Sequence, residues 1–506
     1  LIQVTSNGGG NWTKYEKFPG IPDMTYVSRL AASNHDENTV YAAFDNHKNS
    51  DFKPYLLKSA DAGKTWTSIA SDLPENGPVL AFAEDPVNAN LLFAGTEYGA
   101  FFTIDGGHHW VQLKGGLPTI AVRDMVIQAR ESDLVIATFG RGYYILDNIM
   151  ALRQLKPEST EQAAAMYPVK DALLYIERHP LGEPNHGFQG DAFYTAENPP
   201  YGAVFTAYLK EKIKTKKEKR QDAEKEAAKK NQTAPYPSKD ELRAEAEEPK
   251  PQLYFVVYDE NGTPIRRVDG STGAGFQRVA WDLRYPAPQV GHPHEGREED
   301  FPDSADLGPL VLSGNYSVRM FENIDGKISE VAGPQSFKVV TEGLAGMPAS
   351  DRAAQEEFLR KVSRLYRAVS GSLHAAEDVE SRLKQIREAL HYTPAAEAQL
   401  APVADSLEQR NRALLIALRG DIDIARHSEP ISSSISDRVS SIMDGERFSL
   451  AKPTQSNIDS YNIAASEFSD VLAKLHTLVE VDLAKLEKDM EAAGAPWTPG
   501  RVPDWK

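Results

Sequence analysis

Apolar residues in the first 150 positions form short runs, and Gly, Asn, Asp or Pro separates the runs. Alternating or continuous runs of β-branched and aromatic residues between such turn residues are typical of β-strands. Four runs recur with a period of about 45–55 residues, which is the period of a β-propeller blade. The sequence therefore predicts successive blades over 1–150, with strands at 27–33, 39–46, 54–61 and 66–71 in the first full repeat.

A short turn motif joins the third and fourth strands of a repeat. It reads Ser/Thr-x-Asp/Asn-x-Gly-x-x-Trp and occurs at 5–12, 59–66 and 103–110. The Asp or Asn side chain can accept hydrogen bonds from the backbone N–H groups that follow, and the Gly supplies a backbone conformation that strains other residues. The Trp ring can pack back over the turn. We therefore assign structural roles to Asn7, Gly9, Trp12, Asp61, Gly63, Trp66, Asp105, Gly107 and Trp110.

This motif resembles the Asp box, and the surrounding sequence is similar to the sortilin-type, BNR-repeat propeller proteins of bacteria. Residues 81–110 and 124–148 resemble blades of that family, and residues 198–211 and 279–288 resemble the segment that follows the propeller in larger members. The resemblance implies an Asp-box β-propeller. Sialidases and xyloglucanase-type glycoside hydrolases also carry Asp boxes, so the motif does not separate an enzyme from a binding protein.

The pattern changes after residue 150. A connector that contains Pro and His spans 151–198, and further strand patterns predict an immunoglobulin-like β-sandwich over 199–345. An insertion at 210–250 interrupts the sandwich and consists mainly of Lys, Glu, Ala, Arg and Gln. Such a composition predicts a solvated helix or a disordered arm, and the alternative is a docking arm for an acidic partner.

Apolar residues recur every three or four positions in the last part of the chain, which is typical of amphipathic helices. Three helices are expected, the second over about 397–419 and the third over about 455–493. They predict a helical bundle over 346–495, followed by a tail at 496–506. The expected fold class is therefore mainly β with an α tail: a partial Asp-box β-propeller, an immunoglobulin-like β-sandwich and a C-terminal helical bundle.

The chain begins inside a repeat. Residues 1–18 supply only the last two strands of a blade, and the third repeat stops before its turn motif. Such a set of blades cannot close a ring, and an open ring would expose sheet edges and apolar faces. We therefore expect the C-terminal portion of a longer family member. The missing blades would come from a processed N-terminal portion, a separate chain or another protomer.

Composition narrows the class of protein. The 506 residues include no cysteine, which leaves neither disulfides nor thiol-ligated metals. The net charge of −17 argues against a nucleic-acid-binding protein. No apolar run approaches the length of a transmembrane segment. Together with the family resemblance, these features predict an exported bacterial protein, extracellular or periplasmic.

The loops between second and third strands are expected on one face of the disc, opposite the turn motifs. Ligands commonly bind at such loops. Five residues there are candidates for ligand binding: Asp45, His47, Asp51, Glu97 and Arg141. Among these, Asp45, Asp51 and Glu97 are weak candidates for a catalytic carboxylate pair, which glycoside hydrolysis requires. The alternative is that these residues form ion pairs that join neighbouring blades.

An acidic segment at 292–306 contains His292, His294 and Glu295. A metal site there would be closer to a calcium site than to a zinc site, because oxygen ligands outnumber nitrogen ligands. A loop without a metal is the alternative, and we expect no cofactor. The sequence contains no phosphate-binding loop, dinucleotide fingerprint, nucleophile elbow or zinc-protease motif.

Three functions are compatible with these features. The leading hypothesis is an exported, non-enzymatic binding protein that recognises a peptide, protein or glycan on a propeller face and uses its C-terminal domains for assembly. The alternative is a glycoside hydrolase, xyloglucanase-like or sialidase-like, with a carboxylate pair at the propeller centre. The second alternative is an architectural subunit of a larger complex.

Overall fold

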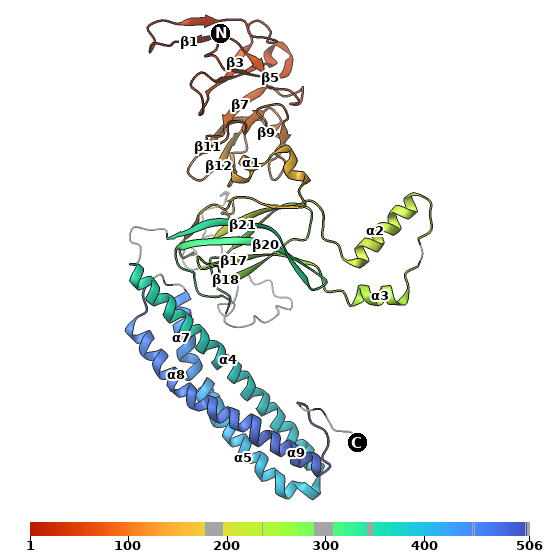
Figure 1. Cartoon of the computed structure of the whole chain (residues 1–506). Coiled ribbons are helices and arrows are strands. Elements are labelled where there is room, and N and C mark those ends of the chain that lie inside the picture. Colours follow the sequence, from red (N-terminus) through yellow and green to blue (C-terminus); the bar gives the residue numbers. More distant parts are fainter. Residues whose placement is uncertain are drawn as a thin grey trace. The chain divides into compact units, whose positions relative to one another are not determined.

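The computed structural model describes residues 1–177, 196–234, 236–287, 307–341, 348–447, 449, 451–500 and 502. The chain divides into two compact units. The first contains Leu1–Ala172, Ala196–Trp281 and Asn315–Lys338, and the second contains Leu173–Thr195, Asp282–Gly314 and Val339–Lys506. Strands dominate the first part of the chain and helices the last part (Figure 1), which confirms the mainly β class with a helical C-terminal region.

Residues 1–150 form four small antiparallel sheets that follow one another along the chain (Figure 1). The N-terminal hairpin consists of β1 (Ile2–Val4) and β2 (Thr13–Tyr15). The first sheet contains β3 (Tyr26–Ala32), β4 (Val40–Asn46), β5 (Asp51–Ser59) and β6 (Thr67–Ser68). The second contains β7 (Val79–Glu84), β8 (Leu92–Thr96), β9 (Gly99–Thr103) and β10 (Val111–Gln112). The third contains β11 (Val122–Gln128), β12 (Asp133–Thr138) and β13 (Tyr143–Leu146).

Neighbouring sheets pack face to face, because every second residue of their strands is apolar and points into the shared layer. Tyr41 and Leu56 of the first sheet share a buried cluster with Phe82 and Phe101 of the second. A second cluster joins the second and third sheets and includes Ala81, Phe93, Val122 and Leu134. A third joins the hairpin to the first sheet and contains Ile2, Phe18, Phe44 and Trp66.

Two further sheets pack against each other. The three-stranded sheet has the order β14 (Ala164–Met166), β16 (Ala203–Leu209) and β19 (Gly275–Trp281). The five-stranded sheet has the order β15 (Ala172–Leu174), β21 (Lys327–Thr341), β20 (Gly314–Ile324), β17 (Gln252–Tyr258) and β18 (Pro264–Gly270). Ring centroids of Phe205 and Phe255, one from each sheet, lie 5.7 Å apart. The range predicted as a connector thus contains β14 and β15, besides α1 (Met150–Gln154) and the short 3-10 helix Pro157–Glu161.

The charged insertion forms two helices, α2 (Lys216–Lys229) and α3 (Lys239–Ala246), and neither buries a residue. Each begins with a capping box, at Thr215 and Ser238. The Arg220 guanidinium joins the helices through hydrogen bonds to both carboxylate oxygens of Glu245, at 2.6 and 3.0 Å. Caps and ion pairs stabilise these helices, because they have no apolar face to bury.

The last part of the chain contains α4 (Ala349–His391), α5 (Pro394–Arg419), α6 (Ile422–Ala425), α7 (Ile435–Arg447), α8 (Gln455–His476) and α9 (Ala484–Ala492). A π-helical segment, Thr477–Leu483, joins α8 to α9, so the third predicted helix is continuous but locally widened. Helix α7 was not expected from the sequence. The apolar stripe of α4 is buried in a common core with α5, α7 and α8, where Val362, Leu383 and Ile386 are each 0% exposed. No helix in the described residues combines the length and apolarity needed to cross a membrane.

Candidate functional site

The repeated turns use their polar groups internally. In the second turn, the Asp61 carboxylate accepts hydrogen bonds from the backbone N–H of Thr65 (2.8 Å), its hydroxyl (2.7 Å) and the Ser59 hydroxyl (2.9 Å). The Trp66 indole N–H donates to the Gly63 carbonyl (3.0 Å), and the backbone of Gly63 has a φ of +86°. Because these contacts engage the Asp61 carboxylate within the turn, we assign it a structural role.

The other two turns repeat this arrangement. Asn7 Oδ1 accepts from the backbone N–H of Asn11 (2.9 Å), and Asp105 accepts from the N–H groups of His108 and His109 (3.0 Å each). Trp110 is nearly buried and donates to the Ile69 carbonyl, whereas Trp12 is 57% exposed. Trp110 is buried because it packs in one cluster with Tyr41 and Leu56 of the first sheet.

Acid should weaken the second turn. The backbone and hydroxyl hydrogen bonds from Thr65 lower the pKa of Asp61 to about 2, whereas an unfolded Asp has a pKa of about 3.9. The stabilisation is therefore full above pH 4 and is lost as the pH falls toward 2. We expect the melting temperature of wild type to exceed that of Asp61→Asn at pH 6, and the difference to shrink by pH 3. Differential scanning calorimetry measures both. A difference independent of pH, or the same trend in the exposed Asp23→Asn variant, would contradict this account.

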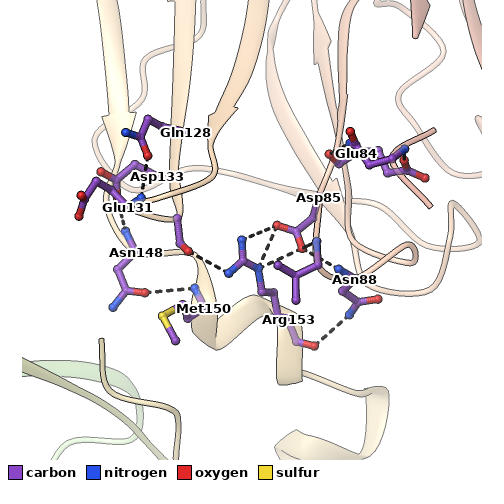
Figure 2. Close-up of polar contacts among 12 residues, drawn as sticks. Glu84, Asp85, Asn88, Gln128, Glu131, Asp133, Asn148, Met150 and Arg153 are labelled. Carbon is purple, nitrogen blue, oxygen red and sulfur yellow. Dashed lines mark hydrogen bonds and ion pairs between the residues drawn. The ribbon is translucent and has the colours of Figure 1, made fainter. Parts of the chain in front are cut away.

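A buried polar network joins the second and third sheets to α1 (Figure 2). Asp85, which is 0% exposed, accepts hydrogen bonds from Arg153 Nε (3.0 Å to each oxygen) and Nη2 (2.8 Å). It also accepts from the backbone N–H groups of Val87 and Asn88. Arg153 Nη1 donates to the Ser132 hydroxyl, and the Asn88 side chain donates to the Arg153 carbonyl, both at 2.9 Å. Because every charge here is paired, the network is structural.

The preceding residue, Glu84, joins the second sheet to the first. Its carboxylate accepts from the hydroxyls of Ser33 (3.0 Å) and Tyr41 (2.8 Å), and from the backbone N–H of Asn34. Arg29 and Asp124 form a further ion pair, at 2.8 Å, between β3 and β11. Sequence analysis predicted ion pairs between blades but placed them at the loop candidates, and it missed Glu84, Asp85 and Arg153. The signal that the sequence offered was two consecutive acids, Glu84 and Asp85, at the end of a strand and directly before Pro86.

The loop candidates fall into two groups. Asp45 is buried and accepts from the backbone N–H (3.0 Å) and ring Nδ1 (2.6 Å) of His47. Asp51 accepts from the Asn46 amide (2.9 Å) and the Tyr55 hydroxyl (2.7 Å). The Asn46 hydrogen bond, with that of Tyr55, keeps the pKa of Asp51 below its ordinary value. Both carboxylates therefore hold the β4–β5 loop in shape.

Glu97 lies in the β8–β9 turn and Arg141 in the β12–β13 turn. No hydrogen bond or ion pair engages either side chain within the described part of the chain. The structure therefore brings Asp45 together with His47 and leaves Glu97 and Arg141 available on the surface.

The β4–β5, β8–β9 and β12–β13 turns share one end of the sheets. The hydroxyls of Ser28, on β3, and Ser33, directly after β3, donate to Val79 and Glu84 at the two ends of β7, so these strands run parallel. The Gly77 N–H donates to the Phe52 carbonyl (2.8 Å), and Gly77 packs beside Tyr98. Val122 at the start of β11 packs on Gly95 near the end of β8. We call this end the loop face.

Five aromatic side chains are exposed on the loop face, and sequence analysis did not single them out. They are Tyr26 (69% exposed), Phe52 (46%), Tyr98 (50%), Phe139 (68%) and Tyr143 (72%). Arg123 stacks on Phe139, with its guanidinium 5.3 Å from the ring centroid. Single exposed apolar residues are ordinary on protein surfaces, whereas five aromatic side chains at one end of neighbouring sheets are a feature that calls for an explanation.

The candidate metal ligands cannot be placed. His292, His294 and Glu295 lie outside the described residues. In the ranges that are described, no group of three or more His, Asp or Glu side chains is arranged to hold a metal ion.

No protein-family model matches the chain, and no curated protein matches it. Among solved structures, an ancestral GH74 enzyme is 24% identical over 23% of this chain and 14% of its own, with a TM-score of 0.20. The GH74 enzyme of Niastella koreensis is 13% identical over 62% of this chain and 46% of its own, with a TM-score of 0.21. The GH74 xyloglucanase from Xanthomonas campestris is 12% identical over 65% and 40%, with a TM-score of 0.20. The chain spans less than half the length of each structure, and at these TM-scores the likenesses carry no argument about fold or activity.

Proposed function

We propose that this chain is part of an exported, non-enzymatic binding protein, and that its loop face binds a peptide or protein. The observation that carries the proposal is the group of five exposed aromatic rings at one end of three consecutive sheets. Burying such rings against a partner would remove a large apolar area from water. Strands and buried ion pairs hold the turns beneath them, so little ordering would accompany binding.

The composition of the loop face favours a protein ligand. Tyr, Phe, Met and Arg are enriched at protein interfaces, whereas Lys and Glu are depleted. The loop face combines its five aromatic residues with Met24, which is 96% exposed, and with Arg123 and Arg141. A peptide could place apolar side chains between the rings and a carboxylate against either arginine.

The runner-up, a glycoside hydrolase, receives less support. Such an enzyme needs one carboxylic acid whose pKa is raised so that it can protonate the leaving group. Asp51 has a lowered pKa, and Asp45 is engaged with His47. Of the three candidate carboxylates, only Glu97 would remain for catalysis, and glycoside hydrolysis requires a second carboxylate.

Substitution of the three carboxylates separates these roles. We expect Asp45→Asn and Asp51→Asn to lower the melting temperature by a few degrees, because each removes charge-assisted hydrogen bonds worth about 1.5–3 kcal/mol. Glu97→Gln should leave it unchanged. Scanning fluorimetry measures the three variants, and reducing-sugar release from xyloglucan measures hydrolysis. If wild type releases reducing sugar, and Asp45→Asn abolishes this release without lowering the melting temperature, the chain is a glycoside hydrolase instead.

We also propose that residues 1–150 are blades of an incomplete Asp-box propeller, and that the two later sheets form an immunoglobulin-like sandwich. An exposed face of the third sheet, in the described part of the chain, supports the need for further blades. There Val126, Val135 and Ile145 are directly opposite one another in register, and Val126 and Ile145 are 59% and 50% exposed. A neighbouring blade, from another chain, another protomer or another part of a longer protein, would cover this row. If such packing were the sole role of the chain, the architectural alternative would hold.

Partner capture tests the proposed binding function. Immobilised wild-type chain would be screened against a random peptide library and a glycan array, beside a Tyr98→Ser/Phe139→Ser variant of equal stability. The proposal expects peptides enriched by wild type and not by the variant. If only glycans are enriched, and the enrichment depends on Tyr98 and Phe139, the loop face recognises carbohydrate instead. If wild type and variant capture the same ligands equally, the loop face is not the binding site.

A further inference from the structure

A concave site lies in the second unit and is independent of the loop face. It is a half-open groove of about 480 Å³ between helix α4 and the paired segments 282–287 and 307–314. Its walls are mostly apolar and include Tyr285, Pro309, Leu310 and Leu359. The groove is within the size range of ligand sites. We call it the α4 groove.

Hydrogen bonds and a close backbone approach tie together the two segments of the wall opposite α4. The N–H of Tyr285 donates to the Pro309 carbonyl (2.9 Å), and the N–H of Val311 donates to the Leu283 carbonyl (2.8 Å). The Arg284 guanidinium also donates to the Gly308 carbonyl (2.9 Å). A Cβ at Gly308 would lie 1.9 Å from the Tyr285 carbonyl oxygen, so the close approach of the two segments requires glycine. A ligand would therefore meet a preformed surface.

Three arginines of α4 line the groove along one helix face. Arg360, Arg364 and Arg367 follow at intervals of four and three residues and span about 10 Å along the helix axis. Arg360 forms an ion pair with Glu356, the one acidic residue among the described residues of the lining. No ion pair or hydrogen bond engages Arg364 or Arg367 in the described ranges. The described residues of the lining thus carry three positive charges and one negative charge, in a chain whose net charge is −17.

Glu356 also accepts a hydrogen bond from the Tyr285 hydroxyl at 3.3 Å. Burial raises the pKa of Tyr285 to about 12, so the phenol keeps its proton under ordinary conditions and remains a donor. Glu356 therefore interacts with Tyr285 and Arg360 at one end of the groove. The positive charge that remains lies toward Arg364 and Arg367.

We propose that the α4 groove binds an acidic peptide segment that carries one large apolar side chain. A single carboxylate or phosphate could engage one or two guanidinium groups, but arginines spread over about 10 Å match a chain with several separated negative charges. The apolar walls provide a place for the one apolar side chain. Apolar anchoring with charge complementarity is how clefts of this kind select peptides.

Fluorescence anisotropy on the full chain tests this proposal. The probe is a fluorescein-labelled peptide, Glu-Glu-Phe-Asp-Glu, with a dissociation constant expected at about 10–100 μM, because a short flexible peptide loses entropy on binding. Arg364→Gln and Arg367→Gln should each weaken binding about three- to tenfold. Ala287→Trp, which fills the groove, should weaken it more than about tenfold. Raising the salt concentration from 50 to 300 mM should also weaken it severalfold.

Arg387→Gln is the matched control, since it removes the same charge from the same helix outside the groove, where Arg387 pairs with Glu408. It should change binding less than about twofold. Absence of binding, or binding that Arg364→Gln, Arg367→Gln and Ala287→Trp leave unchanged, would overturn the proposal. Arginine-dependent binding of dodecanoate without binding of the peptide would overturn it in favour of a lipid-like anion. Failure here leaves the loop-face proposal intact, because the two sites share no residue.

Discussion

Arg153→Met is expected to lower the free energy of unfolding of the first unit by about 3–5 kcal/mol. The substitution preserves most of the side-chain volume but removes the charge that faces Asp85, a carboxylate with 0% exposure. Two backbone N–H groups would still donate to Asp85, but they cannot neutralise it. The Ser132 hydroxyl would also lose its partner. Urea denaturation followed by tryptophan fluorescence measures the change, because four of the six tryptophans lie in the first unit.

Two further variants test whether the buried charge is the cause. Asp85→Asn/Arg153→Met should be less destabilised than Arg153→Met alone, because the amide can still accept the backbone hydrogen bonds without leaving an unpaired charge. Arg130→Met removes a surface pair with Glu131 in which Arg130 is 82% exposed, and should cost less than about 1 kcal/mol. Equal costs for Arg130→Met and Arg153→Met would contradict the account.

Gly107→Ala is expected to destabilise the second sheet by about 3 kcal/mol. Gly107 has a φ of +102°, which strains any residue with a Cβ by about 1–2 kcal/mol. An added Cβ would also lie 2.8 Å from the Cβ of Ile69 and 2.9 Å from its backbone oxygen. Because a backbone atom cannot rotate away, the neighbouring sheet would have to shift, at a further cost of about 1–3 kcal/mol. Chemical denaturation of the purified variant and of wild type measures the total loss in free energy of unfolding.

Gly9→Ala separates the two causes. Gly9 occupies the same position in the first turn with a φ of +99°, and an added Cβ would meet only the Trp12 ring, at 3.9 Å. It should therefore show the backbone strain alone, about 1–2 kcal/mol. If both alanines cost the same, the contact between Gly107 and Ile69 contributes nothing to the packing of neighbouring sheets.

Local features of the fold could be predicted from the sequence. The strands at 27–33 and 39–46 correspond to β3 and β4 because apolar alternation and turn residues act within a few positions. The turn around Asp61 could also be anticipated, since its donors lie within four residues. Helix α7 was missed, because its 13 residues follow a Ser-rich segment without a long apolar stripe.

Contacts between distant residues could not be predicted in this way. Asp85 and Arg153 are 68 positions apart, and nothing in the local pattern of either residue indicates the other. The sequence places the loop candidates only through the order of the strands and gives no exposure for any side chain. Charged residues were therefore chosen as candidates, and the exposed aromatic rings around them were not. Whether a ring such as Phe139 is buried depends on which sheet packs over it, and that is a property of the whole assembly. The ligand-binding role of the loop candidates stays a prediction.

The most direct test of the central claim compares the two ends of the stacked sheets. Isothermal titration calorimetry would measure binding of the captured peptide to wild type, to Phe52→Ser/Tyr98→Ser/Phe139→Ser, and to a matched variant of the opposite end, Trp12→Ser/Val87→Ser/Val111→Ser. The three residues of the control are 57%, 65% and 54% exposed, so equal numbers of exposed apolar side chains are removed from each end. The account predicts a loss of at least about 100-fold in affinity for the loop-face variant, because interface aromatics contribute about 1–2 kcal/mol or more each, and less than about twofold for the control. Equal affinities of the two variants, or a loss confined to the control, would contradict it.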